Sequence, residues 1–228
     1  MSWLVIRFER RGAARYLSHL DTARALQRTF ARAGLQLALT EGMRPKPRFS
    51  LGLPLPVGVA GLDELAAAEL AADQPGGSAE ILARLAAAAP EGLLPLAVEV
   101  SGKRVRLEPL AADYECLVSV PAAELLTAAQ EFAHADSALI ERVSPKGRRE
   151  VDLKRFVAGV DVAPADEGSV LRFTVRHRAD GAARPDEVVR ELLRRAECEE
   201  DVASLVTRVN VVYDGLPVGA YGRESERS

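Results

Sequence analysis

A histidine between two capping residues opens the stretch of sequence best suited to chemistry. Ser18 and Asp21 have the spacing of a capping box, in which the Ser18 hydroxyl accepts the N–H of Asp21 and the Asp21 carboxylate accepts the N–H of Ser18. His19 then takes the first helical position, where free N–H groups and the helix dipole favour anions. His19 is therefore the candidate catalytic residue, as a general acid or base, and the alternative is a plain surface histidine.

Basic residues on the helix expected after His19, and in the loop behind it, form the first candidate anion-binding set. With the capping serine, its members are Ser18, Arg24, Arg28, Arg32, Arg44, Lys46 and Arg48. The three helix arginines recur every four residues opposite the apolar stripe, so they line up along solvent. Together with the loop they would form a groove that follows the phosphates of RNA, and the alternative is a solvated helix face. A second set lies further along the chain: Arg148, Arg149, Lys154 and Arg155.

The loop over residues 42–58 is unusual for a compact domain. It contains prolines at 45, 47, 54 and 56, which fix φ and bias the preceding residues toward extended conformations. Long, stiff loops of this kind usually carry function. The glycines of the loop are not followed by Lys and Ser or Thr, so a nucleotide-binding P-loop is not supported.

The net charge of −3 hides an uneven distribution. Residues 1–50 contain ten Arg and Lys against three Asp and Glu, whereas residues 51–140 contain four against thirteen. This asymmetry favours an anionic partner for the basic segments. The alternative is a bipolar surface that only keeps the protein soluble.

Several site classes are excluded by residue counts. The two cysteines, Cys116 and Cys198, cannot supply the three clustered thiolates of a radical SAM iron–sulfur site, and with three scattered histidines they do not form a zinc site. We therefore expect no metal, no cofactor and reduced thiols. The N-terminus becomes charged after a few apolar residues, so neither a signal peptide nor a membrane span is predicted, and a cytoplasmic location is expected.

Hydrophobic periodicity predicts an α+β protein with two similar halves. The first half reads as strand 3–9, a helix with an apolar face from Leu20 to Ala33, strand 35–39, strand 62–72, a helix capped by Ser78, and strand 94–100. The second half reads as strand 114–120, a helix opened by Pro121, strand 138–143, a basic hairpin, strands 156–162 and 170–176, a helix opened by Pro185, and strand 205–213. Residues 62–72 are alanine-rich and also permit a helix, but their position between two turns favours a strand.

These elements predict two tandem ferredoxin-like (βαββαβ) units with antiparallel sheets. The first unit, with the Gly/Pro basic loop, covers residues 1–105. The second covers residues 106–213. Residues 214–228 lack apolar periodicity and are expected to form a flexible tail.

The chain resembles a bacterial radical SAM-linked protein family of unknown function. The resemblance is carried by Tyr-Leu-Ser-His-Leu-Asp at 16–21, Arg-Ala-Leu-Gln-Arg at 24–28, Arg-Ala-Gly-Leu at 32–35, and Leu-Pro-Leu-Pro-Val-Gly at 53–58. Where the family often has Gly-Phe-Asn-Pro-His-Pro, this chain has Gly-Met-Arg-Pro-Lys-Pro at 42–47, and an acidic motif further on is reduced to Glu-Leu-Ala-Ala at 64–67.

The resemblance implies an accessory role beside a radical SAM protein, because members occur next to or fused with one. Combined with the basic residues, it favours a non-catalytic module that binds RNA or another anionic substrate. One alternative is a metal-independent RNA-processing endonuclease with His19 as general acid or base. Another is a purely structural protein–protein partner. The sequence leaves open whether the protein is an enzyme.

Overall fold

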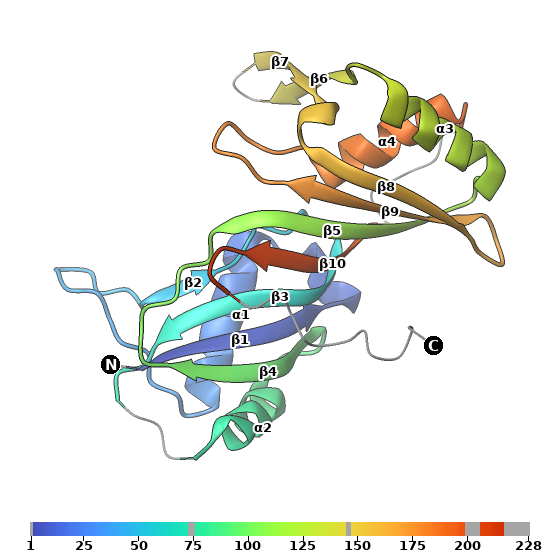
Figure 1. Cartoon of the computed structure of the whole chain (residues 1–228). Coiled ribbons are helices and arrows are strands. Elements are labelled where there is room, and N and C mark those ends of the chain that lie inside the picture. The colour runs from blue at the N-terminus through green and yellow to red at the C-terminus, as the bar shows by residue number, and fades with distance from the viewer. Residues whose placement is uncertain (1, 73–75, 145–146, 199–205, 217–228) are drawn as a thin grey trace. The chain divides into compact units, whose positions relative to one another are not determined.

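The computed structural model describes residues 2–72, 76–144, 147–198 and 206–216 (Figure 1). The chain is a mixed α+β protein with mostly antiparallel strand pairing. Its contacts divide it into two compact units. The first is Met1–Pro109 joined by the segment that begins at Asn210, and the second is Leu110–Val209.

The first unit places two helices against an antiparallel sheet. Its elements are β1 (Trp3–Arg10), the 3-10 helix η1 (Gly12–Tyr16), α1 (His19–Arg32), β2 (Phe49–Leu51), β3 (Ala60–Glu69), α2 (Ser78–Ala88) and β4 (Leu93–Ser101). Strand β1 lies between β4 and β3 and is antiparallel to both, and β2 pairs antiparallel with β3. Strand β10 (Val206–Tyr213), whose residues from Asn210 belong to this unit, is the other neighbour of β3 in the strand order.

The two faces of this sheet differ because side chains alternate along a strand. Leu4, Ile6 and Phe8 of β1 face the helices and pack with Phe30 of α1 and Leu85 of α2 in one hydrophobic core. Residues 3, 5 and 7 of β1 therefore point to the opposite face. A polar pocket can be built on that face without disturbing the core under the helices.

The second unit contains a second set of strands and helices. Its elements are β5 (Pro109–Val118), α3 (Ala122–His134), β6 (Leu139–Ser144), β7 (Gly147–Asp152), the 3-10 helix η2 (Leu153–Arg155), β8 (Val157–Pro164), β9 (Ser169–Arg176) and α4 (Pro185–Arg195). The strand order is β10, β5, β9, β8, and β5, β8 and β9 pair antiparallel. Strands β6 and β7 form a separate two-stranded sheet, so the predicted strand at 138–143 does not join the sheet of β5, β8 and β9 but forms one arm of the β6–β7 hairpin.

The prediction of a strand at residues 62–72 is confirmed by β3, and the alternative helix is wrong. Ala66, Ala67 and Ala68 are all fully buried, so this strand is covered on both faces and shows no polar alternation. The predicted strand at 35–39 is wrong. That segment makes only isolated bridges, Leu37 with Leu70 and Leu39 with Pro47, and the second strand is β2.

Three local predictions at helices need correction. Leu20 is 56% exposed and does not belong to the buried face of α1, where Thr22 and Thr29 are buried instead. Gly77 is the N-cap of α2, so Ser78 is already helical. Pro121 is the N-cap of α3 rather than its first residue. Pro185, by contrast, is confirmed at the first turn of α4. Most of the predicted tail lies outside the described residues.

Candidate anion-binding surface

The first part of the Gly/Pro loop forms an irregular hairpin against the end of β3. The N–H of Ala38 donates to the carbonyl of Glu69 at 2.8 Å, and the N–H of Glu69 donates to the carbonyl of Arg48 at 2.9 Å. The two arms are joined by the N–H of Arg48, which donates to the carbonyl of Ala38 at 2.8 Å. We call residues 36–51 the basic hairpin. Its tip, residues 41–45, is exposed and presents Arg44 to solvent.

The second part of the loop is held by a buried arginine of β1. Arg10 is only 2% exposed. Its Nη2 donates to the carbonyls of Pro56 at 2.9 Å and Val59 at 3.1 Å, and its Nη1 donates to the carbonyl of Leu17 at 3.0 Å. The N–H of Gly58 also donates to the carbonyl of Arg15 at 2.9 Å. Residues 53–59 are thus held in place because their backbone carbonyls accept hydrogen bonds from the charged side chain of Arg10.

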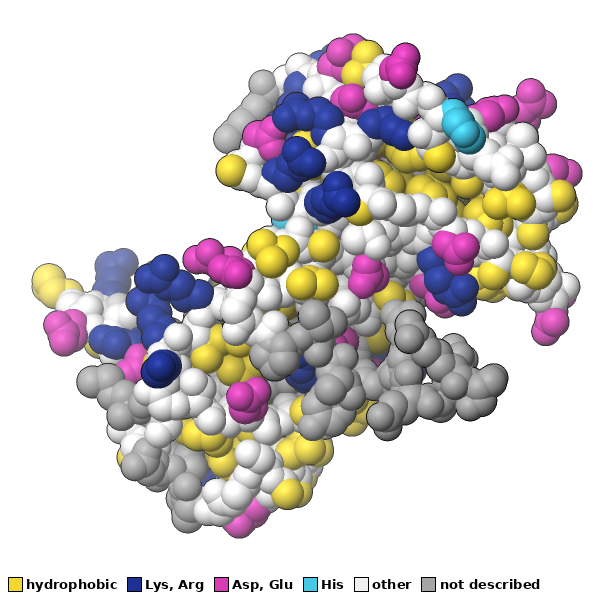
Figure 2. All heavy atoms as spheres, in the orientation of Figure 1, with side chains coloured by type: hydrophobic (Ala, Val, Ile, Leu, Met, Phe, Trp, Pro, Cys, Tyr) yellow, Lys and Arg dark blue, Asp and Glu magenta, His cyan; other side chains and the backbone are white. Residues whose placement is uncertain are grey.

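A pocket of about 660 Å³ lies beside the basic hairpin. It is lined by Trp3, Thr40, Pro47, Arg48, Phe49, Ser50, Glu69, Gly102 and Arg104. Trp3 and Glu69 are directly opposite each other in the β1–β3 register, so both point away from the helices. We call this site the Trp3 pocket. Figure 2 shows dark blue side chains gathered on the first unit over the loop that precedes β2.

The Trp3 pocket is lined by two arginines and one glutamate, and one of the arginines is paired with the glutamate. Arg48 Nη1 forms an ion pair of 3.0 Å with Glu69 Oε2, and the Glu69 side chain is 5% exposed. The Arg104 guanidinium lies 6.0 Å from the centre of the Trp3 ring. Lys46 precedes a lining residue and makes no ion pair in the described part of the chain. A pocket with this lining can receive an anionic, planar ligand.

The arginine stripe of α1 lies elsewhere on the first unit. Arg24, Arg28 and Arg32 are all exposed, and among the residues that the structure describes only Arg24 has an ion pair, at 3.4 Å from Asp21. They belong to a helix that covers the other face of the sheet, and none of them lines the Trp3 pocket. Of the predicted basic residues, the structure therefore places Arg48 in the lining of the pocket and Lys46 one residue before the lining residue Pro47, but it leaves the stripe outside the pocket. Phe49 packs edge-on against Phe30, so it anchors the basic hairpin to the core.

The start of α1 is a helix cap with His19 beside it. Ser18 Oγ accepts the N–H of Asp21 at 3.1 Å, as predicted, but it donates its own hydroxyl proton to the Asp21 carboxylate. His19 lines a cavity of only about 10 Å³ together with Arg10, Thr22 and Glu64, among others. A cavity of that size has room for about one water molecule. The cavity beside His19 is too small for a substrate.

The second basic set is largely occupied by contacts inside its own unit. Arg148 pairs with Glu141 at 3.2 Å, and Arg155 pairs with Asp180. Lys154 Nζ donates to the carbonyls of residues 132 and 133, at the C-terminal end of α3. Arg149 alone in this set is exposed without an ion pair among the residues described.

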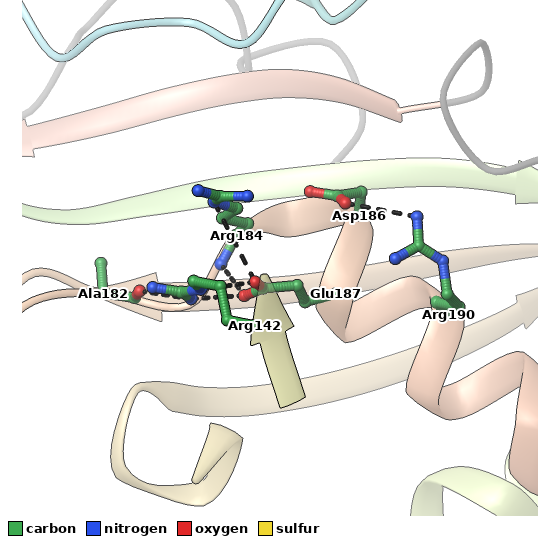
Figure 3. Close-up of polar contacts among 6 residues, drawn as sticks. All are labelled: Arg142, Ala182, Arg184, Asp186, Glu187 and Arg190. Carbon is green, nitrogen blue, oxygen red and sulfur yellow. Dashed lines mark hydrogen bonds and ion pairs between the residues drawn. The ribbon is translucent and has the colours of Figure 1, made fainter. Parts of the chain in front are cut away.

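A buried ion pair lies close to these residues. Arg142 of β6 and Glu187 of α4 are 7% and 6% exposed, and the guanidinium meets both carboxylate oxygens (Figure 3). Arg142 Nη2 also donates to the carbonyl of Ala182 at 3.1 Å, and Glu187 Oε2 accepts the N–H of Arg184 at 2.9 Å. This ion pair joins the β6–β7 hairpin to the start of α4.

Sequence reasoning missed Trp3 and two of the three charged residues that line the Trp3 pocket. Trp3 and Glu69 lie on strands and carry no motif, so only the register of β1 against β3 places them together. Arg104 belongs to the run Lys-Arg-Val-Arg at 103–106, which interrupts an otherwise acidic segment. This local reversal of charge is the signal in the sequence that points to Arg104.

A family model described as an uncharacterized protein conserved in bacteria (DUF2344) matches residues 4–185. The chain belongs to this family. Among solved structures, a chain in the crystal structure of a Cbf5-Nop10-Gar1 complex is similar with a TM-score of 0.53 and 14% identity. The match covers 91% of this chain and 48% of that chain, so this chain spans about half its length. At this identity the likeness concerns the fold alone. No curated protein matches the chain.

Among the described residues of this DUF2344 chain, no group of three or more His, Cys, Asp or Glu side chains could hold a metal ion. Cys116 and Cys198 are both free. None of the helices described is long and apolar enough to cross a membrane.

His177 in the second unit should make stability depend on pH. Burial, and next the positive charge of Arg208, lower the pKa of His177 below its ordinary value of 6.5, and its Nε2 is buried without a hydrogen bond. Because the unfolded chain takes up the proton first, the folded state loses stability as the pH falls below about 6.5. His177→Gln should flatten this dependence in urea unfolding measured at several pH values. His134→Gln, at an exposed position, should leave it unchanged, and equal flattening in both variants would contradict the assignment.

Proposed function

We propose that this chain is a non-catalytic module that binds RNA through the Trp3 pocket and the basic side chains around it. The observation that carries the proposal is a set of exposed cations without ion pairs among the described residues: Arg44, Lys46, Lys103 and Arg104. Exposed charges that are not used inside the fold remain available for phosphates. The pocket between them offers an aromatic ring and hydroxyl groups as well.

RNA suits this surface better than a small inorganic anion. Single-stranded nucleic acid is bound by positive grooves that follow the backbone and by aromatic or guanidinium planes on which bases stack. The exposed Arg104 guanidinium, which lies over the buried Trp3 ring, supplies such a plane, while Lys46 and Lys103 lie next to lining residues. We propose that the arginine stripe of α1 extends the surface on the helix side.

We also propose that both units are ferredoxin-like. In the first unit β1 is flanked by β4 and β3, β2 pairs with β3, and helices follow β1 and β3. The second unit has the order β10, β5, β9, β8, with helices after β5 and β9 and the β6–β7 hairpin inserted before β8. These orders support the interpretation of a repeated βαββαβ unit.

Fluorescence anisotropy of labelled tRNA and rRNA fragments, measured against salt concentration, tests RNA binding. Arg44→Ser/Lys46→Ser should weaken binding and lower the slope of log K against log salt by about 1.4, because two phosphate contacts on a single strand are lost. The matched control is Arg172→Ser/Arg190→Ser, which removes the same charge from exposed, ion-paired positions of the second unit. A flat titration at low salt, or equal losses in both double variants, would refute the proposal.

The accessory role rests on the resemblance to the radical SAM-linked family, and we propose a radical SAM protein as the partner. Affinity capture from the native host with the full chain as bait tests this. Recovery of a radical SAM protein together with RNA is the expected result. Recovery of the protein without RNA would instead favour the purely structural role.

A further inference from the structure

The Trp3 pocket contains a buried carboxylate that the fold uses only in part. The Glu69 side chain is 5% exposed, and its Oε2 accepts a hydrogen bond of 3.0 Å from Arg48 Nη1. Its Oε1 makes no hydrogen bond to any residue that the structure describes, and it is not among the fully enclosed polar atoms. A carboxylate so little exposed has lost most of its water and gains most from a further donor.

The ion pair presents an ordered row of hydrogen-bonding groups. Arg48 donates, Glu69 Oε2 accepts and Glu69 Oε1 accepts, so the row reads donor, acceptor, acceptor. A ligand that matches it must offer an acceptor followed by two donors. Phosphate oxygens do not, because they would meet the carboxylate with like charge.

Among the nucleobases, guanine has the matching edge. Its O6 accepts, and its N1–H and N2–H₂ groups donate side by side, whereas uracil places a carbonyl where the second donor is needed. Cytosine and adenine each carry an acceptor next to their amino group. Single-stranded RNA exposes these edges to proteins, since its bases are not paired.

The walls of the pocket suit a planar base with its phosphate. The Arg104 guanidinium, 6.0 Å from the Trp3 ring centre, provides a plane for stacking. The hydroxyls of Thr40 and Ser50 line the same space. The volume of about 660 Å³ is within the usual range for small-molecule pockets.

We propose that the Trp3 pocket holds one unpaired guanine nucleotide, with the guanine edge on the Arg48–Glu69 pair and the phosphate toward Arg104 and Lys46. This inference rests on the proposed RNA binding and names the element that is recognised. In this arrangement Glu69 recognises the base, and the surrounding cations bind the phosphates of the RNA.

The chain contains a single tryptophan, so the fluorescence of Trp3 reports directly on this pocket. The full chain is titrated separately with GMP, AMP, CMP, UMP and inorganic phosphate. GMP should change the Trp3 emission at the lowest concentration, and phosphate should not change it. Glu69→Gln should weaken GMP binding about tenfold or more, because the amide replaces one acceptor with a donor. Equal responses to all four nucleotides, or a response to phosphate alone, would overturn the inference.

Arg104→Ser provides a second test, since Arg104 is exposed and outside the core. This variant should bind all four nucleotides more weakly by a similar factor and should keep the preference for GMP. Unchanged GMP binding in this variant would count against the pocket. If RNA binds in a salt-dependent way but GMP leaves Trp3 unchanged, only the guanine inference fails. If GMP binds but RNA does not bind at low salt, the proposed function fails.

Discussion

Replacing Arg10 by methionine should lower the free energy of unfolding by about 3–5 kcal/mol. The side chain is 2% exposed and donates to the carbonyls of Leu17, Pro56 and Val59. Methionine keeps much of the aliphatic volume but leaves these acceptors without a donor, at about 1–3 kcal/mol for each one that stays buried. Urea unfolding followed by circular dichroism measures the loss.

Arg11→Met is the matched control, because Arg11 is the next residue but its side chain is 56% exposed and pairs with Glu9. Its effect should stay within about 0.5 kcal/mol. Hydrogen exchange adds a local readout. The N–H of Gly58, which donates to the carbonyl of Arg15, should exchange faster in Arg10→Met. Equal losses of stability in the two variants would show that Arg10 does not hold the loop.

The role of Arg10 also shows where sequence reasoning ends. Local signals predicted the cap of α1 well, since the hydroxyl of Ser18 does accept the N–H of Asp21. Alternation along β1 places Arg10 on the face of Leu4, Ile6 and Phe8, but it does not show which acceptors would meet a guanidinium there. The acceptors in residues 55–59 lie more than forty positions away, and no periodicity connects them to β1.

The basic hairpin gives a second example. Leu35, Leu37 and Leu39 alternate as in a strand, but they make only isolated bridges, and the paired segment is β2. The prolines nearby have no N–H for a ladder, so the chain forms irregular contacts instead. For residues 62–72, only the position between two turns favours a strand over a helix. Alanines that are buried on both faces show no alternation of polar and apolar residues.

Charge alone did not separate surface cations from structural ones. Lys154 and Arg44 look equally available in the sequence, yet Lys154 caps the carbonyl end of α3 whereas Arg44 makes no ion pair among the described residues. The difference depends on which acceptors the fold brings near each side chain. The candidate site could therefore be predicted at the basic hairpin, but not at Trp3 and Glu69, which meet only through strand register.

Replacing Arg142 by methionine should cost about 3–5 kcal/mol of unfolding free energy. Glu187 is 6% exposed, and both of its carboxylate oxygens depend on the guanidinium (Figure 3). Without Arg142 the buried carboxylate keeps the N–H of Arg184, at 2.9 Å, and the exposed Arg184 guanidinium, at 4.0 Å, but loses the buried counter-charge that donates to both of its oxygens. Urea unfolding again measures the effect. Arg190→Met, at a side chain 67% exposed, serves as the control with a change within about 0.5 kcal/mol.

The double variant Arg142→Met/Glu187→Gln separates the loss of the charge pair from the loss of packing. Glutamine removes the buried charge but can still accept the N–H of Arg184, so the helix cap is retained. Most of the stability lost in Arg142→Met should therefore return, because a buried ion pair costs more when it is broken than when both charges are removed. A double variant no more stable than Arg142→Met would mean that Arg142 acts mainly through packing or through its hydrogen bond to Ala182.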